Sequence, residues 1–330
     1  MNRINMDIIR WGIIGCGDVT EKKSGPAFSK VPHSELVAVM RRDAAKAADY
    51  AQRHGVPKWY DQVDDLINDP DVNAIYIATP PDVHKEYTLK ALRAGKPVYV
   101  EKPMARNAAE CEDMVQASRD TGVPLFVAYY RRSLPYFVKL KELIDTQAIG
   151  EIRQVHITIH KTPYPEEVGE SPQPGWRVQP ELSGGGHFHD LASHQFDYLE
   201  YVLGPIQQAK GIARNQAGLY AADDVVQAVF AFESGVVGSG SWCFATNGVE
   251  QKEEAVLLGT LGKITFSFFE RFTISVETEA GTEEFLLPYP PHVQQPLIET
   301  IVAELRGEGR CPSTGETGLR ANRVLDWITG

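Results

Sequence analysis

The stretch Trp11-Gly-Ile-Ile-Gly15-Cys16-Gly17-Asp18-Val19-Thr20 follows a short β-branched run and has the glycine spacing of a dinucleotide-binding turn. In such a turn Gly15 permits the tight reversal, and Gly17 lets the backbone approach a pyrophosphate. The two amides that follow open a helix and would face the phosphates. Thr20 replaces the third glycine of the fingerprint, so the motif alone also fits a turn that binds nothing.

The pattern around this turn favours the binding interpretation. Near-continuous apolar runs separated by helical segments are typical of a parallel sheet covered on both faces. Asp43 and Asn107 stand where helix N-caps are expected. We therefore predict a doubly wound Rossmann domain over residues 1–128. Its strands would include IIRWGIIG (8–15), ELVAVM (35–40), NAIYIATP (73–80), KPVYVEKP (96–103) and PLFVAYY (124–130).

The pattern of the sequence changes after residue 128. A helix (135–145), a strand (150–160) and a long Pro- and Gly-rich stretch (162–186) precede a helix over 190–203. Six further strands between residues 223 and 288 are joined by short turns at 234–235, 261–262 and 280–281, and helices over 294–306 and 316–329 close the chain. Consecutive strands with short turns predict an α+β domain with an open, mostly antiparallel sheet over 129–330.

Composition limits the partners and the compartment. The 330 residues include 33 Lys and Arg against 44 Asp and Glu, a net charge of -11 that repels nucleic acid and anionic lipid alike. No apolar run approaches the roughly 20 residues of a membrane span, and the start lacks the apolar core of a signal peptide. Four cysteines form no Cys-x-x-Cys pair. We expect a cytoplasmic protein that binds neither nucleic acid nor membrane.

The end of the second strand bears on the type of cofactor. Folds that bind NAD commonly carry an acidic residue there, whereas this chain has Arg41 and Arg42 before Asp43. A guanidinium can make bidentate bonds to a 2′-phosphate. The alternative, two solvated arginines at a helix start, is disfavoured by the helix dipole. We predict that NADP(H) is preferred and that NAD(H) is possible.

Three further segments carry a family resemblance. They are Ile77-Ala-Thr-Pro-Pro-Asp-Val-His84, Tyr99-Val-Glu101-Lys102-Pro103, and Gly184-Gly-Gly-His-Phe-His-Asp190-Leu-Ala-Ser-His194-Gln-Phe-Asp197. In this order they closely resemble the glucose-fructose oxidoreductase / inositol dehydrogenase family, also written Gfo/Idh/MocA, over nearly the whole chain. The resemblance implies an NAD(P)-dependent oxidoreductase that acts on a sugar, cyclitol or related polyol. It also implies a homodimer or homotetramer assembled through the sheet of the second domain.

The resemblance assigns roles to individual residues. Catalytic roles fall on Lys102, Asp190 and His194. Substrate binding adds Arg132, Trp176 and Arg177 to these three. The cofactor-binding candidates are Gly15, Gly17, Asp18, Val19, Arg41, Arg42, Thr79, Pro80, His84, Glu101 and Lys102. Thr20, Arg41 and the pair His187/His189 depart from the family pattern and leave the cofactor type and the substrate open.

The residue chemistry agrees with these roles. Hydride transfer involving a secondary alcohol needs a group that moves the hydroxyl proton and a positive group that stabilises the developing alkoxide. His194 can move the proton, and Lys102, at the carboxyl end of a strand, can supply the charge. Asp190 lies one helical turn before His194 and could orient the imidazole or hold a substrate hydroxyl. The alternative is a core histidine in an ordinary contact with that carboxylate.

Other interpretations stay open at this point. His187, His189, Asp190 and His194 are zinc-ligand types, but their spacing matches no metal motif, and we predict no metal site. Trp176, Tyr164 and Tyr289 could form a wall that stacks on a sugar, or could be ordinary core aromatics. The family that the chain resembles also contains nicotinamide-dependent glycosidases and non-catalytic sensors, which are the alternative functions.

Overall fold

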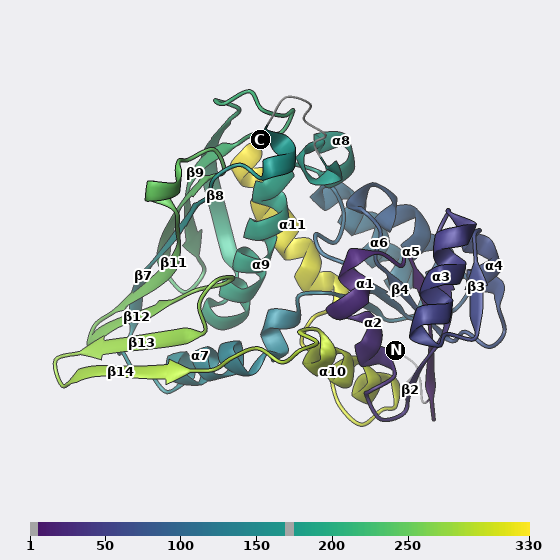
Figure 1. The fold of residues 1–330 in the computed structure, drawn as a ribbon. Coiled ribbons are helices and arrows are strands. Elements are labelled where there is room, and N and C mark those ends of the chain that lie inside the picture. Colours follow the sequence, from purple (N-terminus) through teal and green to yellow (C-terminus); the bar gives the residue numbers. More distant parts are fainter. Residues whose placement is uncertain (1–5, 169–174) are drawn as a thin grey trace. The chain divides into compact units, whose positions relative to one another are not determined.

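The computed structural model describes residues 6–168 and 175–330, which form two compact units (Figure 1). The first unit holds the chain up to Leu134 together with Pro290–Leu319, and the second holds Pro135–Tyr289 and Arg320–Gly330. The sequence placed every residue after 128 in the second domain, whereas the contacts group a late segment with the first unit. No helix in the described ranges is long and apolar enough to cross a membrane.

The first unit contains a six-stranded, entirely parallel sheet with the order β3-β2-β1-β4-β5-β6. This order confirms the predicted doubly wound Rossmann fold. The strands are β1 (Ile9–Ile14), β2 (Ser34–Met40), β3 (Lys58–Tyr60), β4 (Ala74–Ile77), β5 (Val98–Val100) and β6 (Leu125–Val127). The sequence analysis missed β3, because this short edge strand has an exposed Trp59 and lies in no continuous apolar run.

Helices connect these strands, and their predicted caps are confirmed. The Asp43 carboxylate accepts a bond from the Lys46 backbone N–H at 3.1 Å, and the Asn107 side chain accepts one from Glu110 at 2.9 Å. The helical segments are α1 (Asp18–Lys22), α2 (Gly25–Phe28), α3 (Ala44–His54), α4 (Val63–Asn68), η1 (Pro81–Val83), α5 (His84–Arg93), α6 (Ala108–Thr121), η2 (Tyr130–Ser133) and α10 (Gln295–Leu305).

The late helix α10 belongs to the first unit because its apolar face enters the core of that unit. Leu297, Ile298 and Ile301 are fully buried in the same hydrophobic cluster as Trp11 and Tyr76. Burial of such side chains contributes roughly 1.5–3 kcal/mol each. The sequence gives α10 an amphipathic pattern but does not say which sheet it covers.

The second unit contains an eight-stranded sheet with the order β14-β13-β12-β11-β7-β10-β9-β8. Only the β7/β10 pair is parallel, which confirms the predicted mostly antiparallel sheet. The strands are β7 (Ile152–His160), β8 (Ile206–Arg214), β9 (Val225–Phe232), β10 (Val237–Cys243), β11 (Lys252–Gly259), β12 (Gly262–Phe266), β13 (Thr273–Thr278) and β14 (Gly281–Leu286). The sequence analysis missed β8, which is poor in β-branched residues.

One face of this sheet is covered by the long helix α9, which spans Gly186–Leu203 (Figure 1). Phe188 and Phe196 of α9 pack against Trp242 of β10, whose indole N–H donates to the Gln195 side chain at 2.8 Å. The other helical segments of this unit are α7 (Pro135–Asp145), η3 (Pro165–Glu167), η4 (Trp176–Val178), α8 (Pro180–Ser183) and η5 (Gly248–Glu250). The helix α11 spans Gly315–Thr329. The start of α9 lies four residues earlier than the sequence predicted.

Candidate functional site

The carboxyl ends of parallel strands meet at one edge of the first unit's sheet, and the predicted cofactor residues follow those ends. Gly15 follows β1, Arg41 follows β2, Thr79 follows β4 and Glu101 follows β5. Because all these strands run parallel, the topology brings the four segments to the same edge.

The glycine turn is closely packed at Gly15 and open at Gly17. Gly15 has a φ of +93°, and a Cβ there would lie 2.7 Å from the Thr79 Cγ2 atom and 3.0 Å from its backbone nitrogen. A Cβ on Gly17 would meet nothing nearer than the Gly15 oxygen at 3.9 Å. The Thr20 hydroxyl contacts the Gly17 backbone N–H at 3.0 Å and its carbonyl at 2.7 Å, so threonine caps α1 where the fingerprint has a glycine. These residues fit a dinucleotide.

The arginine at the end of β2 lies against this turn. One guanidinium nitrogen of Arg41 donates to the Cys16 carbonyl oxygen at 3.1 Å. Arg42 is exposed beside it, and Asp43 is engaged as the cap of α3. Burial raises the pKa of the Cys16 thiol to about 11, so that thiol stays neutral at ordinary pH. Arg41 therefore places a positive charge directly against the turn.

His84 ties two loops of this edge together. Its imidazole is buried, with Nε2 2.8 Å from the Thr79 carbonyl oxygen. Its Nδ1 lies 3.1 Å from the Pro103 oxygen and 3.2 Å from that of Met104. Burial lowers the pKa of His84 below its usual value. The geometry fixes the loop after β4 against the turn that follows Lys102, whose peptide bond to Pro103 is cis.

Arg132 lies in η2 of the first unit and is buried. Its guanidinium donates to the Pro312 carbonyl oxygen at 2.8 Å, which joins η2 to the segment that returns late in the chain. The role of Arg132 in substrate binding stays a prediction.

The second unit carries the other candidate residues at the start of α9. Asp190 and His194 lie one helical turn apart, and the side chain of Asp190 is 14% exposed. The Arg177 Nε donates to this carboxylate at 3.3 Å, and the Arg177 guanidinium lies 4.6 Å from the centre of the Trp176 ring. The fold thus brings together both residues of the predicted substrate-loop pair and the acid of α9.

Two residues near this cluster were missed by the sequence analysis. The ring of Phe269 lies edge-on to that of buried His194, with centroids 6.1 Å apart. The buried Glu167 carboxylate lies 2.6 Å from the His187 Nε2 atom. Both contacts join segments far apart along the chain, and no local pattern marks them.

The glycines before α9 serve packing within the unit. A Cβ on Gly185 would lie 2.0 Å from the His189 ring, and one on Gly186 would lie 2.5 Å from the Ala222 Cβ. Within the described ranges, no group of three histidine, cysteine or acidic side chains could hold a metal ion.

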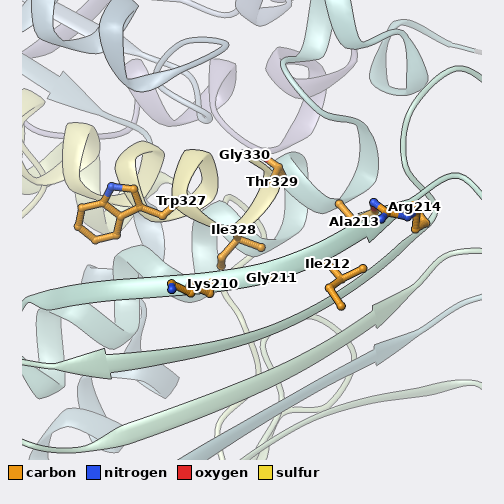
Figure 2. Close-up of a pocket in the computed structure, with 9 residues that line it drawn as sticks. All are labelled: Lys210, Gly211, Ile212, Ala213, Arg214, Trp327, Ile328, Thr329 and Gly330. Carbon is orange, nitrogen blue, oxygen red and sulfur yellow. The ribbon is translucent and has the colours of Figure 1, made fainter.

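A cavity of about 280 Å³ lies in the second unit (Figure 2). It is formed between the edge strand β8 and the end of α11. Its lining residues are Lys210, Gly211, Ile212, Ala213, Arg214, Trp327, Ile328, Thr329 and Gly330. None of the predicted site residues lines it.

Both parts of the chain match known protein families. Residues 9–129 match the family described as "Oxidoreductase family, NAD-binding Rossmann fold", and residues 137–265 match the "GFO/IDH/MocA C-terminal domain". Oxidoreductase P35 of Formosa agariphila is 41% identical over 98% of each chain. The 1,5-anhydro-D-fructose reductase of Ensifer adhaerens is 28% identical over 94% of this chain and 92% of its own.

Solved structures share the fold over almost the whole length. A levoglucosan dehydrogenase in complex with NADH superposes with a TM-score of 0.86 at 23% identity, covering 97% of this chain and 95% of its own. A 3-ketoreductase from Actinomadura kijaniata in complex with NADP gives 0.83 at 23% identity and covers 97% of both chains. At these identities the likeness concerns the fold.

Proposed function

This chain belongs to the Gfo/Idh/MocA family of oxidoreductases and is an NAD(P)-dependent dehydrogenase or reductase; on that premise we propose that it interconverts a secondary alcohol and a ketone on a sugar, cyclitol or related polyol, with NADP(H) preferred. The observation that carries the proposal is the gathering of the Gly15 turn, Arg41 and the Glu101-Lys102 segment at one sheet edge. The names of two similar proteins, 1,5-anhydro-D-fructose reductase and levoglucosan dehydrogenase, support a sugar-derived substrate.

The first unit would bind the dinucleotide through its glycine turn and Arg41. Gly15 makes the tight turn, Gly17 leaves room for the pyrophosphate beside it, and the Arg41 guanidinium would pair with a 2′-phosphate. The bound nicotinamide supplies or accepts a hydride. Similar folds have been solved with NADH and with NADP, so the preference for NADP(H) rests on Arg41.

His194 is the proposed acid-base catalyst. It would accept the hydroxyl proton during oxidation and return it during reduction. Lys102 would stabilise the negative charge that develops on the substrate oxygen. Asp190 would hold a substrate hydroxyl or orient the imidazole, with Arg177 fixing the carboxylate from the other side.

The experiment is a screen of cyclitols, aldoses and keto-sugars with NADP⁺, NAD⁺ and their reduced forms. Net formation or consumption of NADPH with at least one substrate is the expected result. Cleavage of a glycoside without net reduction would replace the proposal by a nicotinamide-dependent glycosidase. Cofactor binding without turnover on any substrate would favour a sensor.

We further propose that the protein assembles as a homodimer or homotetramer through the sheet face opposite α9, and that it works in the cytoplasm. Val229 and Val237 are more than half exposed on that face. Apolar side chains gathered on one open surface usually mark an interface.

A further inference from the structure

A buried polar network adjoins Lys102, and the proposed mechanism does not use it. The carboxylate of Glu101 is only 7% exposed. One of its oxygens accepts bonds from the Tyr76 hydroxyl at 2.5 Å and the Gln294 side-chain amide at 2.6 Å. The other accepts a bond from the Lys102 backbone N–H at 3.2 Å. A buried carboxylate requires such donors, because burial without them is costly.

The amide of Gln294 is itself fixed in orientation. The Tyr99 hydroxyl donates to its side-chain oxygen at 2.7 Å, which leaves the NH₂ group directed at Glu101. The Gln294 backbone N–H donates to the Lys23 carbonyl oxygen at 3.2 Å. Gln294 and both tyrosines are fully buried. Burial raises the pKa of Tyr76 and Tyr99 well above the usual value, so both hydroxyls stay protonated and remain donors.

We propose that Tyr76 and Gln294 are positioning residues for Lys102. They hold the Glu101 carboxylate, and the carboxylate holds the backbone at the point where β5 ends and Lys102 begins. This inference rests on the proposed function, because it assumes that Lys102 stabilises charge on the substrate. A misplaced charge loses much of its effect on a transition state, so the fixing of this backbone bears on the rate.

A buried tyrosine outside this network gives a matched control. Tyr136 is as fully buried as Tyr76, but its hydroxyl accepts a bond from the Ser267 backbone N–H at 3.0 Å and donates to the Thr273 carbonyl oxygen at 3.3 Å. We expect Tyr76→Phe to have a kcat about tenfold below that of Tyr136→Phe, the effect of one bond to a charged group. The kcat of Gln294→Met should fall by about as much as that of Tyr76→Phe. The Kd for NADPH should stay within about twofold in all three, because the Gly15 turn and Arg41 are unchanged.

A second measurement reports on Lys102 without turnover. Acetylation by an amine-reactive ester, followed by peptide mass spectrometry, should proceed at a changed rate at Lys102 in Tyr76→Phe and Gln294→Met. The acetylation rate at Lys96, whose ammonium donates to the Asp69 carbonyl oxygen, should be the same in these two variants as in the parent protein and in Tyr136→Phe.

The outcomes separate this inference from the proposed function. In an active enzyme, equal kcat values for Tyr76→Phe and Tyr136→Phe would overturn the positioning role, whatever the acetylation rates. If the parent protein reduces or oxidises no substrate, the proposed function fails and acetylation alone decides. A changed Lys102 rate confined to Tyr76→Phe and Gln294→Met then supports the inference, and an unchanged rate overturns it.

Discussion

Arg41 carries the cofactor preference at the scale of a single residue. Its guanidinium already lies against the glycine turn through the Cys16 carbonyl oxygen, so a 2′-phosphate would need little rearrangement to reach it. We expect Arg41→Asp to raise the KM for NADPH by at least tenfold more than the KM for NADH, since a charged bidentate contact is worth about 1.5–3 kcal/mol. The control Arg93→Asp makes the same charge change at an exposed position of α5 and should alter neither KM. Equal KM changes for the two cofactors in Arg41→Asp would refute the preference.

His194 and Lys102 divide the proposed chemistry at the same scale. His194→Ala should lower kcat by about 10² to 10⁴, the usual range for lost acid-base catalysis, while the Kd for NADPH stays unchanged. Lys102→Ala should lower kcat/KM at least as much. The double variant should lose less activity than the product of the two single losses, because the effects of groups that act in one step are not additive. A near-normal kcat in His194→Ala across the pH range would move proton transfer to Lys102.

The start of α9 makes stability depend on pH at the scale of one element. His189 is buried beside Gly185, and burial lowers its pKa from about 6.5 to about 4. Since the folded pKa is the lower one, the stability contribution of His189 is complete above about pH 6.5. It is lost as the pH falls toward 4, because the unfolded chain then binds the proton more readily.

We expect this histidine alone to cost about 2 kcal/mol of unfolding free energy between pH 7 and pH 5. Urea unfolding at the two pH values measures it. His189→Asn should be less stable at pH 7 but should show a correspondingly smaller loss at pH 5. The control, His33→Asn in the exposed turn before β2, should keep the parent's pH dependence. A parent-like loss in His189→Asn would contradict the assignment.

Elements whose signals are local were predicted, and those defined by distant contacts were not. The caps at Asp43 and Asn107 bond within three residues, so the sequence shows them directly. Gln294 reaches Glu101 across 193 positions, and Phe269 reaches His194 across a helix and several strands. Neither contact leaves a periodic pattern. The strand β8 was not predicted, because an edge strand with one polar face lacks an apolar run.

Assembly is the property that belongs to the whole molecule. In the second unit, α9 covers one face of the sheet, while Ile212, Val229 and Val237 on β8, β9 and β10 are 63%, 58% and 51% exposed. In the register of the sheet, Val229 pairs with Ser239 and Val237 with Ala231, so the two valines lie on neighbouring strands. Polar side chains surround these valines on the same face, among them His156, whose imidazole contacts the Ser239 hydroxyl at 2.8 Å.

A two-fold interface would bury each of these valines twice, once in each subunit. Burial of an exposed valine contributes roughly 1.5 kcal/mol or more, and a lysine in its place adds a desolvation cost. We therefore expect the double variant Val229→Lys/Val237→Lys to raise the dimer Kd at least a hundredfold and to sediment as a monomer at micromolar concentration, where the parent sediments as a dimer or tetramer. Val249→Lys, in η5 and 90% exposed, makes the same kind of change in a loop and should leave the assembly intact. The proposed interface would be wrong if the parent protein is monomeric under these conditions, or if the double variant sediments like the parent.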